Sequence, residues 1–152
     1  MSTPAASLQD QFFPEGECFG CGPRNTAGLR LRSFANGAGA IAEWTPRNIH
    51  QAVPGVLCGG IVSTLLDCHT GAALAHAVHG RTGKWPFLED APWATAKLDL
   101  ELVRPTSLAL PVTLRAHVTE IGDDEATVEA ELHSDGRLRA RCCAHWRKVV
   151  RR

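Results

Sequence analysis

Residues 59–79, GGIVSTLLDCHTGAALAHAVH, decide the fold of this chain. The apolar residues of this stretch recur at spacings of three, four and seven, which is typical of a helix with one buried face. They are Ile61, Val62, Leu65, Leu66, Ala72 and Ala73. The pattern predicts a helix of about 20 residues, the longest element in the chain. The rest of the chain must cover its apolar side.

Strands are expected on both sides of this helix. Before it, Leu29 and Leu31 alternate with arginines, Asn36 and Gly37 indicate a hairpin turn, and residues 39–45 form the returning strand. After it we expect three or four strands with short links, which favour an antiparallel meander with one apolar face. Their alternating runs are 94–103, 112–118, 126–132 and 138–146. This order predicts an α+β domain in which a curved sheet wraps around the helix.

Composition and charge favour one globular domain. The chain has 152 residues, of which 44% are apolar and 21% charged, so it can bury a sizeable core. Sixteen basic residues balance sixteen acidic ones, which argues against a nucleic-acid or membrane-surface binder and leaves little repulsion against self-association. With no apolar run of membrane-spanning length and no signal peptide, we expect a cytoplasmic protein. Prolines and glycines predict an irregular segment over 1–28, before a domain over 29–152.

The cysteines and histidines raise the question of a metal. Cys18 and Cys21 form a C-x-x-C pair, but none of the other cysteines completes a second pair; these are Cys58, Cys68, Cys142 and Cys143. The helical histidines, His69, His76 and His79, close no ligand set with a carboxylate. We therefore expect no metal site and read the cysteines as buried or structural thiols. A redox role is disfavoured because no helix begins after Cys21.

Asp67 is the chemically informative residue of the predicted helix. At helical spacing it shares a face with small residues, namely Gly60, Ser63, Thr64 and Gly71. Small side chains allow a ligand or another backbone to approach closely. The Gly59-Gly60 start presents free N–H groups and a positive dipole end, which can stabilise a developing oxyanion. The alternative is a solvated surface aspartate and a loose helix start.

The spacing of Gly60 and Asp67 limits how they can cooperate. They are seven residues apart, so they lie about 10 Å apart along a helix axis. One small reacting group cannot contact both within one helix. If both serve one site, two copies of the chain must contribute, which predicts a dimer.

Three stretches resemble the hotdog-fold acyl-CoA thioesterases of the phenylacetate-pathway (PaaI-like) type. They are CFGCGPRNTAGLRLRSF (18–34), NIHQAVPGVLCGGIVSTLLDCHTGAAL (48–74) and WATAKLDLELVRPTSLALPVTLRAHV (93–118). The resemblance implies a hotdog fold, and a dimer or dimer of dimers whose sheets join edge to edge. It also implies hydrolysis of an acyl-CoA thioester to a free acid and coenzyme A, without a cofactor.

The resemblance also assigns catalytic roles. Asp67 corresponds to the catalytic carboxylate, a general base on water or a nucleophile. The Gly60 N–H corresponds to the group that polarises the thioester carbonyl, and Gln51 lies near a side chain that assists it. Thr95 matches the Ser/Thr that holds the attacking water. Gly60 and Gln51 would come from one subunit, Asp67 and Thr95 from the other.

Substrate contacts are expected from Cys58, Gly59, Thr64 and Arg104. Arg104 is either a phosphate contact for coenzyme A or a solvated arginine at a strand end. Cys58 stands where the family usually has histidine, and we read it as a packed thiol, with a nucleophile as the alternative. Without the imidazole, a non-catalytic acyl-CoA-binding protein stays open as an alternative function. A hydratase is a third option, but it needs a histidine and an aspartate that converge on the α- and β-carbons of the substrate, and we see no such histidine in the matched helix.

Thr95 departs from the expected pattern. It has the alternation of Lys97 and Asp99, which belong to the polar face of their strand. We therefore expect strand twist, or a position at the subunit seam, to bring Thr95 to the site.

Overall fold

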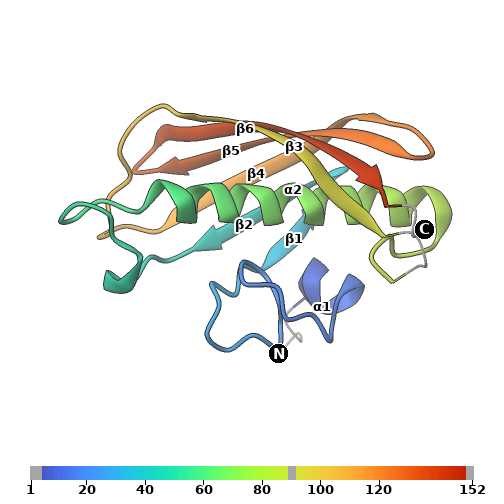
Figure 1. Ribbon diagram of the computed structural model, residues 1–152, viewed down its shortest axis with the longest axis horizontal. Helices are drawn as coiled ribbons and strands as arrows, with labels where there is room; N and C mark the ends of the chain where they lie inside the picture. The colour runs from blue at the N-terminus through green and yellow to red at the C-terminus, as the bar shows by residue number, and fades with distance from the viewer. Residues whose placement is uncertain (1–4, 89–91, 150–152) are drawn as a thin grey trace.

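The computed structural model describes residues 5–88 and 92–149. A six-stranded antiparallel sheet curves around one long helix, α2, as predicted (Figure 1). The elements follow the expected order: β1 (Ser33–Asn36), β2 (Gly39–Trp44), α2 (Gly59–Thr82), β3 (Trp93–Leu102), β4 (Val112–Ile121), β5 (Glu125–Ser134) and β6 (Arg137–Lys148). Two short helices add to these, α1 (Leu8–Phe12) and the 3₁₀ turn η1 (Asn48–His50).

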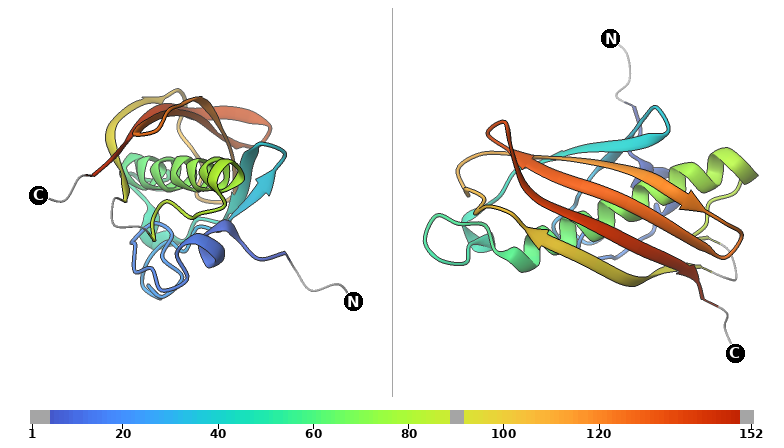
Figure 2. Two further views of the ribbon diagram at one scale, coloured as in Figure 1. Left: turned by 90° about the vertical axis from the view of Figure 1, so that its right-hand side faces the viewer. Right: turned by 90° about the horizontal axis from the view of Figure 1, so that it is seen from above.

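The strand order corrects one prediction. It is β1-β2-β4-β5-β6-β3, so the expected meander holds only for β4, β5 and β6. β3 pairs with β6, and β4 takes β2 as its other neighbour. Residues 103–111, which contain two prolines, carry the chain from the β3 edge to the middle of the sheet. This crossing places strands on both flanks of α2, as the end-on view of Figure 2 shows.

The core lies between the concave face of the sheet and α2. The alternation predicted for β4, β5 and β6 is confirmed, because their inward residues are buried; examples are Val112, Leu114, Val128, Leu132 and Ala144. They pack against Leu65, Leu66 and Leu74 of the helix. α2 is slightly longer than predicted and ends at Gly83, whose φ of 74° is the left-handed conformation of a helix C-cap.

The N-terminal segment covers the side of α2 that faces away from the sheet (Figures 1 and 2). Its helix α1 was not expected, and Ser7 caps it by accepting the N–H of Asp10. Leu29 and Leu31 are buried, but they do not form the predicted strand, because Arg30 has a φ of 57°. The boundary at residue 28 stays a prediction. Among the described residues, no helix combines the length and apolarity needed to cross a membrane.

Candidate active site

Asp67 and Thr95 form a direct contact in the folded chain. The Thr95 hydroxyl on β3 donates a hydrogen bond of 2.6 Å to Oδ1 of Asp67, in the first half of α2. Burial raises the pKa of Asp67, the bond from Thr95 opposes that rise, and the charge of Cys18 adds to it. The pair is therefore a half-buried carboxylate with one hydroxyl partner.

A β-bulge brings Thr95 to the helix. Thr95 pairs with Trp146 and Lys97 pairs with His145, so Ala96 is an extra residue in β3. The bulge reverses the alternation: Trp93 and Thr95 face inward before it, and Leu98 and Leu100 face inward after it. The predicted inward positions of Ala94 and Ala96 are wrong, since both are exposed. We expected strand twist, or a position at the subunit seam, to bring Thr95 to the site, but the bulge turns Thr95 toward α2 instead.

The small residues on the same face of the helix as Asp67 have different structural roles. A side chain at Gly71 would lie 3.0 Å from the Trp146 ring, so this glycine allows close packing of β6 on α2. Trp146 Nε1 donates to Thr70 Oγ1 at 3.2 Å and fixes the ring there. Thr64 donates its hydroxyl to the carbonyl of Gly60 at 2.9 Å, within the helix.

The start of α2 forms a second group of predicted site residues. Cys58 is the N-cap, and its carbonyl accepts the N–H groups of Ile61 and Val62. Within the described part of the chain, the Gly60 N–H has no acceptor. Gly60 is exposed, and an added side chain would meet only Cys58 Sγ, at 3.8 Å. Its N–H is thus available to a ligand.

Gln51, Gly59 and Arg104 lie around this helix start. Gln51 forms a β-bridge with Leu57, and its side chain accepts the Gly55 N–H at 3.3 Å. Gly59 packs closely on the end of β3, because a side chain there would lie 2.9 Å from Leu102 Cδ1. Arg104 follows β3 and donates to the carbonyl of Leu138 at 3.0 Å. Asp67 belongs to the other group, seven residues further along α2.

His69 is buried in the core, and both of its ring nitrogens form hydrogen bonds there. Its Nε2 lies 3.1 Å from the Ala40 carbonyl, which can only accept, so Nε2 carries the proton and Nδ1 accepts the Ser33 hydroxyl at 2.8 Å. Gln9 Nε2 donates to the same hydroxyl oxygen at 3.1 Å. Burial lowers the pKa of His69 to about 4, which keeps the ring neutral. His69 is therefore a structural residue of the core.

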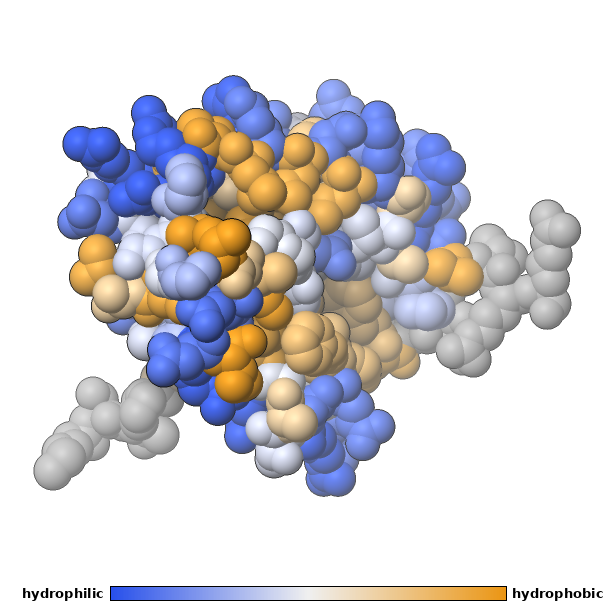
Figure 3. Space-filling view, turned by 60° about the vertical axis from the view of Figure 1, so that its left-hand side comes forward, coloured by the Kyte–Doolittle hydropathy of each residue, from blue (hydrophilic) through white to orange (hydrophobic). Residues whose placement is uncertain are grey.

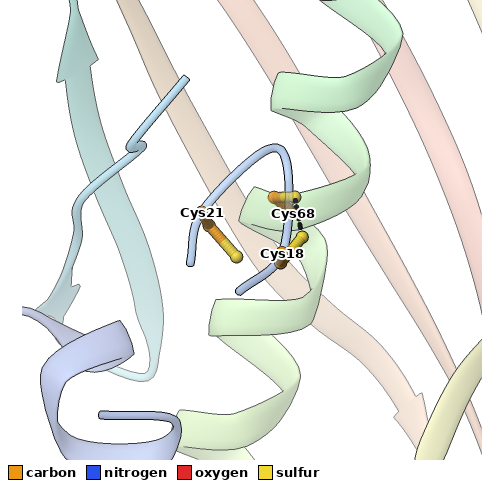
Figure 4. A group of neighbouring side chains, drawn as sticks. All are labelled: Cys18, Cys21 and Cys68. Carbon is orange, nitrogen blue, oxygen red and sulfur yellow. Dashed lines mark hydrogen bonds between the residues drawn. The ribbon is translucent and has the colours of Figure 1, made fainter. Parts of the chain in front are cut away.

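The sequence did not predict one cluster of potential ligands. The Sγ atoms of Cys18, Cys21 and Cys68 all lie within 4.8 Å of one another (Figure 4). Cys68 follows Asp67 on α2, whereas the other two belong to the N-terminal segment. The spacing of the cysteines along the chain does not predict this cluster. Their proximity depends on how the N-terminal segment lies across α2.

Comparison with known proteins gives a family and a fold. The family model described as the thioesterase superfamily matches residues 54–140, more than half of the chain. Among curated proteins, none matches. A solved thioesterase superfamily protein from Shewanella loihica is 27% identical, with a TM-score of 0.62 over 79% of this chain and 91% of that one.

Two more distant structures show the same fold. A phenylacetic acid degradation-related protein from Ralstonia eutropha is 22% identical, with a TM-score of 0.69 over 94% of this chain and 99% of that one. The PaaI protein from the phenylacetic acid degradation operon of E. coli is 13% identical, with a TM-score of 0.66 over 80% and 81%. The predicted hotdog fold, a curved antiparallel sheet around one helix, is confirmed.

Proposed function

This chain belongs to the thioesterase superfamily, and we propose that it hydrolyses an acyl-CoA thioester to a free acid and coenzyme A. The observation that carries the proposal is the half-buried carboxylate of Asp67 in contact with the Thr95 hydroxyl. A carboxylate whose pKa is raised by burial is a better base toward water than a solvated one.

The hydrogen bond defines how water would be held. Thr95 donates its one hydroxyl proton to Oδ1 of Asp67, so its oxygen keeps lone pairs that can accept from a water molecule. Asp67 takes a proton from that water, whose oxygen attacks the carbonyl carbon. The C–S bond then breaks, and the departing thiolate receives the proton. In the alternative route, Asp67 itself attacks the carbonyl carbon, the C–S bond breaks and the coenzyme A thiolate leaves. Water then hydrolyses the resulting anhydride to the free acid and the Asp67 carboxylate.

The oxyanion of the tetrahedral intermediate needs a donor from elsewhere. We assign this role to the Gly60 N–H, with Gln51 beside it, because this N–H is free and lies at the positive end of α2. Gly60 and Asp67 lie about 10 Å apart along one helix. The donor for one Asp67 therefore comes from the Gly60 of a second subunit.

Two features of the surface support association of two subunits. β3 is an edge strand of ten residues, and such an edge can pair with a second copy. Figure 3 shows hydrophobic side chains gathered among hydrophilic ones on the side where α2 begins. Exposed Ile49 and Val53 precede that helix, and exposed Leu102 ends β3. We propose a dimer joined along β3, either alone or within a dimer of dimers.

The substrate contacts remain those predicted around the helix start. Cys58 and Gly59 begin α2, and Thr64 lies one turn after Gly60. Arg104 is exposed, and among residues 5–88 and 92–149 its guanidinium donates one hydrogen bond, to the Leu138 carbonyl, which leaves donors for a phosphate of coenzyme A.

Cys58 supports a second candidate function. Its side chain makes no capping hydrogen bond, and a thiol is a weaker donor than the imidazole that the family usually has there. An acyl-CoA-binding protein without hydrolysis would tolerate that replacement. The two candidates differ in whether bound acyl-CoA releases its thiol.

Asp67→Asn tests the proposal directly. We expect wild type to release thiol from a panel of acyl-CoA esters and Asp67→Asn to be at least about 100-fold slower, since the base is lost. Asp135→Asn is the matched control, because Asp135 is exposed in the turn between β5 and β6 and lies outside β3; it should retain wild-type rates. If wild type binds acyl-CoA but releases no more thiol than Asp67→Asn, the protein is a binding protein.

A further inference from the structure

We propose that Cys18, Cys21 and Cys68 form a binding site for one zinc ion that fastens the N-terminal segment to α2. Figure 4 shows the two cysteines of the loop and the helical cysteine around a common centre. Their Sγ atoms lie within 4.8 Å of one another, and Cys18 Sγ is 3.8 Å from Cys68 Sγ. The zinc proposal does not rest on the proposed hydrolysis, although Cys68 directly follows Asp67 on α2.

The sulfur spacing fits zinc. Zn–S bonds measure about 2.3 Å, so two thiolates on one tetrahedral ion lie roughly 3.8 Å apart. The Cys18–Cys68 distance already has this value, and the other sulfurs need only small side-chain adjustments. Thiolates favour zinc and other soft ions over magnesium or calcium. The sequence argument against a metal compared cysteines only along the chain and therefore missed Cys68.

The loop that carries Cys18 and Cys21 is built to bring its sulfurs to the helix. A side chain on Gly20 would lie 2.3 Å from Cys68 Sγ, and one on Gly22 would lie 2.3 Å from the backbone N of Cys18. Gly22 N–H donates to the Cys18 carbonyl at 2.8 Å and closes the turn. Glycine is therefore required sterically at both positions: at Gly20 by the close approach of the loop to α2, and at Gly22 by the tight turn of the loop itself.

The charge around the cluster suits a cation bound by thiolates. When Zn²⁺ binds, the three thiols each lose a proton to solvent and become thiolate ligands. The resulting site has a net charge of −1. Arg32, which donates to the Cys21 carbonyl at 3.4 Å, places a positive charge beside it.

The fourth zinc ligand comes from solvent. Within the part of the chain that the structure describes, this group contains three ligands and no further histidine, cysteine or carboxylate. Cys18 is exposed, so water can reach the ion from that side. Three protein ligands and one open position are compatible with tetrahedral zinc.

Metal binding to reduced protein tests the proposal. Chain stripped with a chelator and kept reduced is titrated with Zn²⁺, and with Co²⁺ to record thiolate-to-metal absorption in the near ultraviolet. We expect one ion per chain, strong thiolate absorption, and binding at least about 100-fold weaker in Cys18→Ser and Cys68→Ser, since losing a ligand costs more than losing its outer-shell partner. Cys143→Ser, on the outer face of the sheet, is the control and should bind like wild type.

Limited trypsin digestion tests the role of the ion. Arg24 and Arg30 are exposed in the N-terminal segment, and zinc should slow cleavage at both in wild type but not in Cys18→Ser. Cys18 is exposed, so this variant is expected to fold, and circular dichroism checks that it does. The proposal is wrong if wild type binds no more tightly than Cys18→Ser, if Cys143→Ser weakens binding equally, or if zinc leaves the digestion unchanged.

Discussion

At the scale of single residues, the structure separates two polar groups that lie two positions apart on α2. Asp67 has a hydroxyl neighbour at Oδ1, and no described residue forms a hydrogen bond with its Oδ2, so that oxygen is available for chemistry. His69 has both ring nitrogens engaged inside the core, so its surroundings leave none. The difference follows from the helix: one residue faces β3 and the other faces β1 and β2.

The buried neutral state of His69 predicts a loss of stability in acid. The pKa of His69 is about 4 in the folded chain against 6.5 for an ordinary histidine, so below pH 6.5 the unfolded chain binds the proton first. The contribution of neutral His69 to the free energy of unfolding should therefore be fully present above about pH 6.5. As the pH falls toward 4, the free energy of unfolding should decrease by up to about 3 kcal/mol.

Urea unfolding between pH 7.5 and pH 4 measures this effect. In His69→Gln the decline should be shallower, although the variant is less stable throughout because the Ser33 bond changes. His117→Gln, which alters an exposed histidine of β4, should keep the wild-type slope. Equal slopes in wild type and His69→Gln would contradict the assignment.

At the scale of elements, the glycines of α2 differ in whether close packing requires them. Gly71 lies against the Trp146 ring, whereas nothing lies within 4 Å of a side chain added at Gly80. Gly71 is in the middle of α2 and Gly80 is in its last turn. Within a helix alanine is intrinsically favoured over glycine by up to about 1 kcal/mol.

These surroundings predict opposite effects of the same substitution. Gly80→Ala should raise the free energy of unfolding by about 0.5–1 kcal/mol, because it gains helix propensity without a clash. Gly71→Ala should fail to gain it, because its new Cβ would lie 3.0 Å from the ring. Thermal and urea unfolding of the two variants compare them directly. Equal stabilisation by both would show that Trp146 does not require Gly71.

The elements also show what the sequence can and cannot predict. The helix and the inward residues of β4, β5 and β6 follow from periodicity, because each element repeats one regular geometry. The bulge at Ala96 breaks that regularity, so the alternation assigned the wrong face to Thr95. Before β1, the left-handed backbone of Arg30 likewise interrupts the regular strand geometry that the alternation of Leu29 and Leu31 predicted.

At the scale of the whole molecule, meetings between distant segments could not be read from the sequence. Short links predicted β3 beside β4, but the sheet must flank α2 on both sides, and β3 takes the far edge. Cys68 meets Cys18 for the same kind of reason, since the segment lies across the helix. The Asp67–Thr95 contact was expected only through the family resemblance.

We propose that each active site takes Asp67 from one subunit and Gly60 from the other. Asp67→Asn removes the carboxylate, and Gly60→Pro removes the N–H in the first turn of α2, where proline is tolerated. Each substitution alone should give an inactive dimer. A dimer that combines one chain of each kind would contain one intact site out of two.

Thiol release by purified mixed dimers, prepared with two different tags, tests this claim most directly. The dimer of an Asp67→Asn chain with a Gly60→Pro chain should have about half the wild-type activity, because one of its two shared sites is intact. The dimer of a wild-type chain with a chain carrying both substitutions should be inactive, because each of its sites lacks one group. The reverse result, an inactive first dimer and a half-active second one, would contradict the account.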